Sequence, residues 1–392
     1  MLRVHVRNGT ELVFEDPPGV IHLVVTLMRT LRLPDDGNCY PLPAGLGPFP
    51  LRDVAEYRDR VPVEWLKRPG VIVPMYSCEA LWISIESKRD HPNAIKVGAG
   101  LINAVSGEPW DPSLRTEQPP SFLNWLLGRN PAQDYLVCPP QCWFDGFNTG
   151  YGTVRQFVAV PLGKGQTVEA LVTGKEEHGG IQLLVYQPKE GRFLHPTSEI
   201  APGAPPTRKS TRDDLSNRDV PFGSEDALTP ELLNQPTETG ASIIPPVGSA
   251  RRPRDTRRPN TPSDATQPTA VPTAARSSRP EQRRITLGAP LSVRKRSSAP
   301  VLGLAMGGQL MQKVYGDPHG LYTWDASNCA EMFVHIVSPE RFRSITGEQP
   351  PPTPITRAMY EAAGFGWVAV FDDLNDITPS PILKNLPTLG KP

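Results

Sequence analysis

The stretch from about Pro196 to Pro300 constrains the fold of this chain more than any other feature. There the apolar periodicity disappears and Pro, Ser, Thr and Arg take over, as in Arg251-Arg252-Pro253-Arg254-Asp255-Thr256-Arg257-Arg258-Pro259. A segment of this composition cannot bury enough apolar area to offset its chain entropy. The sequence therefore predicts a disordered insertion over 196–300, and a packed core has to form from the residues on either side of it.

The insertion is basic, although the whole chain carries no net charge. Residues 249–298 contain 12 Lys or Arg against 3 Asp or Glu, while the 392-residue chain has 41 of each class. The excess of nine positive charges leaves about nine negative charges elsewhere. Weak, non-specific nucleic-acid binding through Arg251 to Arg296 is one hypothesis, and Arg294-Lys295-Arg296 fits a nuclear import signal. Because no aromatic residue there offers a base-stacking platform, a solubilising or regulatory tether is the favoured interpretation.

Residues 71–195 are predicted to form a β-rich core. Short runs of β-branched and aromatic residues recur between turn clusters, among them 71–76, 81–85, 154–160, 168–172 and 181–186. Asn148 to Gly152 suits a hairpin connection between two of these runs. The predicted fold class is mainly β (α+β), an antiparallel β-sandwich or barrel-like core with a few short helices.

The N-terminal 70 residues are predicted to be an α+β segment. Asn8-Gly9 suits a hairpin turn between two short strands. Apolar residues then recur at helical spacing from Ile21 to Leu31, which predicts a helix over 19–32. Shorter helices are expected over 52–60 and, inside the core, over 122–127 after Ser121 as N-cap.

Residues 301–378 become periodic again after the insertion. Strands are expected at 310–315, 332–337 and 367–371, and both Ser338-Pro339 and Thr353-Pro354 have the form of a helix start. A unit of this size with three strands is marginal alone. We therefore expect it to complete the core begun before the insertion, followed by a tail over 379–392.

Several classes of protein do not fit the sequence. The longest apolar run, 20–28, is far too short for a spanning helix, which indicates a soluble intracellular protein, cytoplasmic or nuclear. Five scattered cysteines do not make a disulfide framework, and Cys138 and Cys142 are interpreted as structural or incidental rather than as a metal or redox site. Phosphate-loop, dinucleotide, zinc-protease and serine-hydrolase motifs are missing, so no cofactor and no metal is predicted.

Three aromatic positions are candidate ligand-binding sites. Trp110, Trp143 with Asp145, and Trp324 with Asp325 place aromatic rings near polar groups. Sugar and peptide sites are built in this way, because the ring face supplies apolar area and the neighbours supply directional hydrogen bonds. A buried tryptophan plug is the favoured explanation for Trp143, and a turn leading into a strand for Trp324.

A cluster of carboxylates and histidines is the candidate catalytic site. Glu177 and His178, together with the distant His319, could act as a general acid–base pair. If His178, His319 and His335 met in space with Glu176 or Asp325, a metal site would become credible. The sequence does not establish that meeting, and a polar hairpin tip is the favoured interpretation of Glu177 and His178.

Parts of the chain resemble a family of uncharacterised microbial proteins. The resemblance lies in Val73-Pro74-Met75-Tyr76, Ile102 to Trp110, Glu177-His178-Gly179-Gly180 and Asp317-Pro318-His319-Gly320. It covers 60–190 and 301–372 and skips the insertion. Members are sometimes labelled integral membrane proteins, which the short apolar runs of this chain contradict. The resemblance implies an organisation into two parts and no particular activity.

Three hypotheses of function follow from the sequence. The first is a non-enzymatic β-rich binding or interaction protein with a flexible basic tether and an unknown protein or small-molecule ligand. The second is a hydrolase- or lyase-type enzyme using Glu177, His178 and His319, with or without a metal. The third is nucleic-acid association through the tether.

Overall fold

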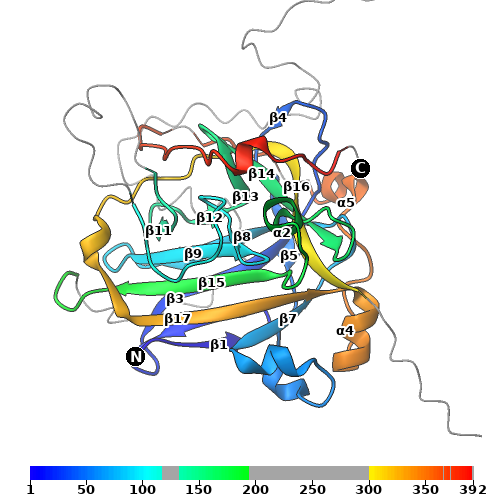
Figure 1. Cartoon of the computed structure of the whole chain (residues 1–392), viewed down its shortest axis with the longest axis horizontal. Helices are drawn as coiled ribbons and strands as arrows, with labels where there is room; N and C mark the ends of the chain where they lie inside the picture. The colour runs from blue at the N-terminus through cyan, green and yellow to red at the C-terminus, as the bar shows by residue number, and fades with distance from the viewer. Residues whose placement is uncertain (117–131, 194–299, 365, 371, 391–392) are drawn as a thin grey trace, which may run out of the picture. The chain divides into compact units, whose positions relative to one another are not determined.

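A computed structural model describes the chain except for residues 117–131, 194–299, 365, 371 and 391–392 (Figure 1). The predicted insertion, its basic residues Arg251 to Arg296 and the helix expected at 122–127 therefore lie almost entirely outside the described residues. Contacts group Met1–Thr237 with Ser297–Pro392, and the rest of this section concerns the described part of that unit.

The described residues form one mostly antiparallel sheet system, which confirms the predicted β-rich fold class. Its strands are β1 (Arg3–Arg7), β2 (Glu11–Glu15), β3 (Ile21–Thr30), β4 (Cys39–Tyr40), β5 (Gly45–Pro48), β6 (Arg52–Asp53), β7 (Gly70–Pro74), β8 (Ala80–Ser87), β9 (Asn93–Ala99), β10 (Ile102–Asn103), β11 (Leu136–Cys138), β12 (Trp143–Phe144), β13 (Gly146–Gly150), β14 (Thr153–Pro161), β15 (Ile181–Pro188), β16 (Val301–Met311) and β17 (Trp324–Val337).

Helices are short in the described residues. The α-helices are α2 (Val168–Thr173), α4 (Pro339–Thr346) and α5 (Arg357–Ala362), and the 3-10 helices are η1 (Val54–Tyr57), η2 (Val63–Lys67), η4 (Leu321–Thr323) and η5 (Leu383–Asn385). No helix among the described residues has the length and apolar character needed to cross a membrane.

Two layers of strands face each other across the main core. The first layer runs β1–β2–β3–β8, and the second contains β7, β17, β15 and β9 side by side (Figure 1). Alternate residues of β3, such as Leu23 and Val25, belong to the same buried cluster as Ile95 and Val97 of β9. Apolar side chains from both layers therefore exclude water between them, which is the main stabilising contribution in such a sandwich.

The strands after the unplaced segment pair with strands before it. β16 is antiparallel to β14 from Thr153 paired with Met311 to Pro161 paired with Leu302. β17 is antiparallel to β15 and parallel to β7. Residues on either side of 194–299 thus share one sheet system.

Several local predictions are confirmed. Asn8 and Gly9 both have positive φ and connect β1 to β2, as a tight hairpin requires. A second hairpin joins β13 to β14. α4 begins after Ser338, whose side chain accepts a hydrogen bond from the Arg341 backbone N–H.

Other local predictions are wrong. The helix expected over 19–32 is strand β3, which is buried on both faces and therefore shows no polar face from which its period could be read. The helix expected over 52–60 is replaced by β6 and a single 3-10 turn, η1. The strand expected at 168–172 is α2, because Thr167 caps its N-terminus and Gly174, with φ of 75°, ends it.

The C-terminal part also differs from expectation. The strand expected at 310–315 starts earlier, at Val301, and ends at Met311. The strand expected at 367–371 is reduced to an isolated bridge between Leu42 and Val368. α5 starts at Arg357 after the cap Thr356, later than Thr353-Pro354 predicted. The expected tail is packed where described, with Leu383 fully buried.

Candidate functional site

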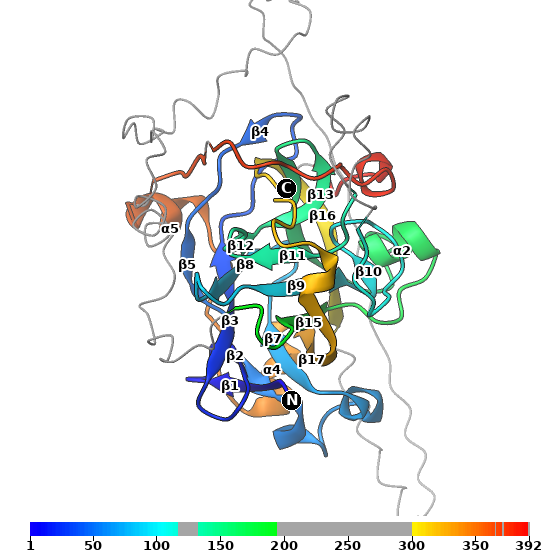
Figure 2. The same cartoon turned by 90° about the vertical axis from the view of Figure 1, so that its left-hand side faces the viewer.

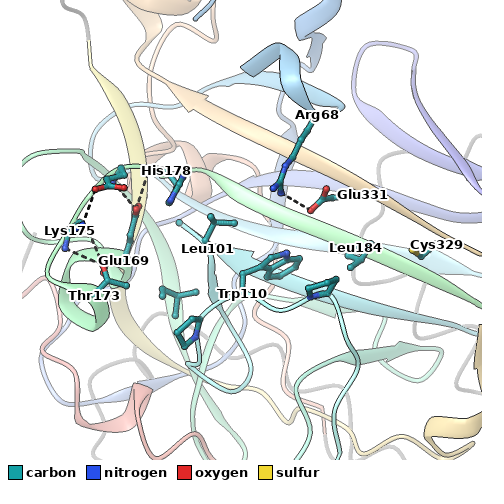
Figure 3. Close-up of a pocket in the computed structure, with 15 residues that line it drawn as sticks. Arg68, Leu101, Trp110, Glu169, Thr173, Lys175, His178, Leu184, Cys329 and Glu331 are labelled. Carbon is teal, nitrogen blue, oxygen red and sulfur yellow. Dashed lines mark hydrogen bonds and ion pairs between the residues drawn. The ribbon is translucent and has the colours of Figure 1, made fainter. Parts of the chain in front are cut away.

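A groove of about 760 Å³ lies on the outer face of the β9–β15–β17 sheet, and we call it the Trp110 groove (Figure 3). Its floor follows from the strand register, because Leu184 of β15 stands opposite Glu331 of β17 and next to Lys96 of β9. Its volume is within the range of about 300–1,000 Å³ common for ligand pockets. Its lining residues are Arg68, Gly100, Leu101, Ile102, Pro109, Trp110, Pro112, Glu169, Thr173, Lys175, Glu177, His178, Leu184, Cys329 and Glu331.

The Trp110 ring lies on this face of the sheet because the β9 residue beneath the ring, Gly98, has no side chain. A Cβ added at Gly98 would come within 2.7 Å of the indole ring, so only glycine allows this close approach. The Trp110 backbone N–H donates to the Leu101 carbonyl at 2.8 Å and fixes the start of the loop. The ring is half-buried, and its indole N–H has no hydrogen-bond partner within the described part of the chain.

A buried lysine holds the loop that carries Trp110. The Lys96 ammonium donates to the Asp134 carboxylate at 2.7 Å and to the backbone carbonyls of Asp111 and Ser113. It also lies 6.0 Å from the Trp110 ring centroid, within reach of a cation–π contact. One charged group therefore ties the loop on both sides of Pro112 to strand β9.

The opposite wall of the groove comes from α2 and the loop after it, which lie beside β10 (Figure 2). The buried Glu169 carboxylate accepts the backbone N–H groups of Glu177 at 2.8 Å, His178 at 2.9 Å and Gly179 at 2.8 Å. Three consecutive N–H groups that converge on one carboxylate fix the conformation of the loop. Glu177 and His178 are thereby presented to the groove.

The neighbouring Glu176 carboxylate also fixes backbone conformation, here by accepting hydrogen bonds from the segment before α2. Its carboxylate accepts N–H groups from Gly163, Gly165 and Thr167 and the Thr167 hydroxyl. Burial raises the pKa of Glu176, but these hydrogen bonds to the ionised form lower it more, so the pKa lies below its ordinary value. Glu176 is therefore a structural residue and is not part of the groove lining.

Four exposed or half-buried charges line the groove in two loose ion pairs. Lys175 Nζ lies 3.6 Å from Glu177 Oε1, and Arg68 Nη1 lies 3.4 Å from Glu331 Oε1 (Figure 3). Burial raises the pKa of the Glu331 carboxyl, and the Arg68 guanidinium opposes that rise only in part. Such exposed pairs contribute little to stability, so their hydrogen-bonding capacity is open to a ligand.

Comparisons of the chain with protein-family models, with curated proteins and with solved structures found no match. The assignment of the Trp110 groove therefore rests on the geometry above.

Three of the residues predicted from the sequence meet in the groove. Glu177 and His178 come from the α2 loop, and Trp110 comes from the loop after β10. The His178 ring is exposed and has no hydrogen-bond partner among the residues that the structure describes. One ligand-binding candidate and two acid–base candidates thus share a single site.

Trp143 and Asp145 do not reach a surface. Trp143 packs in the main core, and Asp145 is fully buried. The Asp145 carboxylate accepts the Gln312 side-chain N–H at 2.9 Å, and the Asp145 backbone N–H donates to the same amide at 2.9 Å. This agrees with the interpretation of the segment as a buried plug, and neither residue lines the groove.

His319, Trp324 and Asp325 form a separate group. Asp317 accepts the Trp324 indole N–H at 2.8 Å, and the His319 ring packs edge-on against Trp324, with burial lowering the pKa of His319. Asp325 accepts the backbone N–H and hydroxyl of Ser327 in a surface turn. These contacts match the predicted turn leading into a strand.

The histidines have different surroundings, and none of the three contacts another. His335 stacks on Trp65 with ring centroids 4.1 Å apart, whereas His178 lines the groove and His319 packs on Trp324. Across the described ranges, no three His, Cys, Asp or Glu side chains are placed to hold a metal ion. The Cys138 thiol donates to the Ile85 carbonyl and is buried.

Arg68, Lys96, Glu169 and Glu331 were missed at the sequence level. Each is a single charged residue in a strand, helix or loop, and nothing in its local sequence marks it. Gly98-Ala99-Gly100 did carry a signal, because glycine inside a strand indicates a close approach by another group.

Proposed function

We propose that the protein is a non-enzymatic binding protein and that it holds a small ligand in the Trp110 groove. The observation that carries the proposal is the half-buried Trp110 ring, which lies on the sheet over Gly98 with its indole N–H unpaired in the described structure. An aromatic face held this rigidly offers apolar contact area and a directional donor at a low entropic cost.

The surroundings of the ring support binding more than catalysis. Glu177 and His178 lie in the groove, but His319, the third residue of the acid–base hypothesis, packs against Trp324 outside the lining. Glu169, the most buried carboxylate in the groove, is occupied by three backbone N–H groups. The groove thus offers ligand contacts, while the acid–base hypothesis lacks its third residue there.

A ligand-observed NMR screen of a fragment library against the full chain tests the proposal. Fragments that bind wild type are expected to lose binding in Trp110→Ala. Gly98→Ala is expected to weaken the same fragments by about tenfold, since the added methyl group displaces the indole ring. Gly366→Ala is the matched control, because a Cβ there meets no atom within 4 Å. Hits that are indifferent to Trp110→Ala in a correctly folded protein would refute the proposal.

A further inference from the structure

The four exposed or half-buried charges in the Trp110 groove cancel. Arg68 and Lys175 supply two positive charges, and Glu177 and Glu331 supply two negative ones. The fifth charged group, Glu169, is buried and its negative charge faces three N–H dipoles. A groove without an excess of either sign does not select for a charged ligand.

The backbone donors that would suit a phosphate are already used. The N–H groups of Glu177, His178 and Gly179 form a concave site of the kind that binds anions, and the Glu169 carboxylate fills it. Glu176 likewise occupies the N–H groups of Gly163, Gly165 and Thr167. A phosphorylated ligand would have to displace an internal carboxylate to reach these donors.

The central strand of the groove floor also offers no free edge in the described structure. β15 pairs with β9 on one side and with β17 on the other. An extended peptide therefore cannot add to β15 through its main chain. What remains is a flat aromatic surface surrounded by side-chain donors and acceptors.

We infer that the ligand of the Trp110 groove is an uncharged saccharide; this inference rests on the binding function proposed above. A pyranose ring has an apolar C–H face that can lie on Trp110, and its hydroxyl groups both donate and accept hydrogen bonds. The carboxylates of Glu177 and Glu331 accept from hydroxyls, while the Arg68 guanidinium and the Trp110 indole N–H donate to them. The groove lining thus supplies both donors and acceptors, as such a ligand requires.

Isothermal titration calorimetry of the full chain tests this inference. The probes are hexasaccharides of glucose, mannose, xylose and N-acetylglucosamine, with AMP and a heparin hexasaccharide as anionic probes. At least one neutral hexasaccharide is expected to bind with an affinity that is insensitive to salt. Trp110→Ala should weaken that binding by tenfold or more, about 1.4 kcal/mol, and Trp110→Phe should weaken it less. Tyr322→Ala removes an exposed aromatic ring outside the groove and should have no effect.

The outcomes separate this inference from the proposed function. If only an anionic probe binds in a Trp110-dependent manner, the saccharide inference is overturned while the binding function of the groove stands. If no neutral hexasaccharide binds at all, the inference is likewise overturned. If binding survives Trp110→Ala but fails in Tyr322→Ala, both the inference and the proposed site are wrong.

Discussion

The Lys96 ammonium lies 2.7 Å from the Asp134 carboxylate, with the two side chains 1% and 7% exposed. Lys96 stands on a strand whose residues are all buried, and its other hydrogen bonds go to the carbonyls of Asp111 and Ser113. The Lys96 ammonium has almost no contact with bulk water, so hydrogen bonds to these three partners replace its hydration. The pair therefore couples the stability of the sheet to the position of the Trp110 loop.

Lys96→Met is expected to destabilise the protein by about 3–5 kcal/mol, because it leaves the Asp134 carboxylate buried without its partner. Urea unfolding followed by far-UV circular dichroism measures this loss. Lys175→Met is the matched control: Lys175 is 72% exposed and should change stability by less than about 0.5 kcal/mol. Replacement of both charges in Lys96→Met/Asp134→Leu should recover part of the loss. Equal stability of the two single variants would show that the pair is not a buried clamp.

Glu169→Ala is expected to cost at least about 3 kcal/mol, since it leaves three backbone N–H groups without their acceptor. The vacated site should then bind an anion, so phosphate should raise the melting temperature of this variant more than that of wild type. Glu177→Ala, which alters an exposed neighbour, is the control. An equal response to phosphate in variant and wild type would contradict the view that Glu169 fills an anion site.

His335 is expected to make stability depend on pH. Burial lowers its pKa to about 4, whereas an unfolded histidine titrates near about 6.5. The unfolded state therefore takes up a proton first, and stability that is present above pH 6.5 is lost as the pH falls toward 4, by at most about 3 kcal/mol. Unfolding of His335→Phe at several pH values should show a smaller loss over this window. Phe333→Leu, which keeps the histidine, should retain the wild-type slope.

Neither part of the chain is expected to fold alone. Fragments 1–195 and 301–392 divide the β14–β16 and β15–β17 pairings, so each leaves strand edges and apolar faces uncovered. Expressed separately they should lack cooperative unfolding, and co-expressed they should purify as a complex. A 301–392 fragment that unfolds cooperatively by itself would contradict a shared core.

The sequence predicted the class of fold because closely spaced β-branched runs and turn residues are local signals. It failed where both faces of a strand are buried: Val24 and Val25 are both inaccessible in β3, and apolar residues on both faces produced a spacing that also fits a helix. At α2 the apolar run suggested a strand, whereas the decisive signals were the cap Thr167 and the terminator Gly174. In a segment this short, the capping residues decide the secondary structure more than the apolar composition does.

The groove could be predicted only in part. Trp110, Glu177 and His178 were recognised from residue type, but their meeting depends on pairings between β9, β15 and β17, which are far apart in the sequence. Trp143 was weighed both as a ligand-binding aromatic and as a buried plug, and the plug interpretation holds; the choice depended on which strands cover it. Charged residues such as Arg68 join the site only through tertiary structure.

The pairing of β14 and β15 with β16 and β17 has a consequence for synthesis on the ribosome. β15 ends at Pro188 and β16 begins at Val301, so more than a hundred residues are translated between strands that become neighbours. At about 5–20 residues per second, the nascent chain keeps an incomplete sheet for roughly 5–20 seconds. During that time the open edges of β14 and β15 are templates for pairing with other chains. Chaperone dependence during translation, rather than low stability of the finished protein, is then expected to limit its yield.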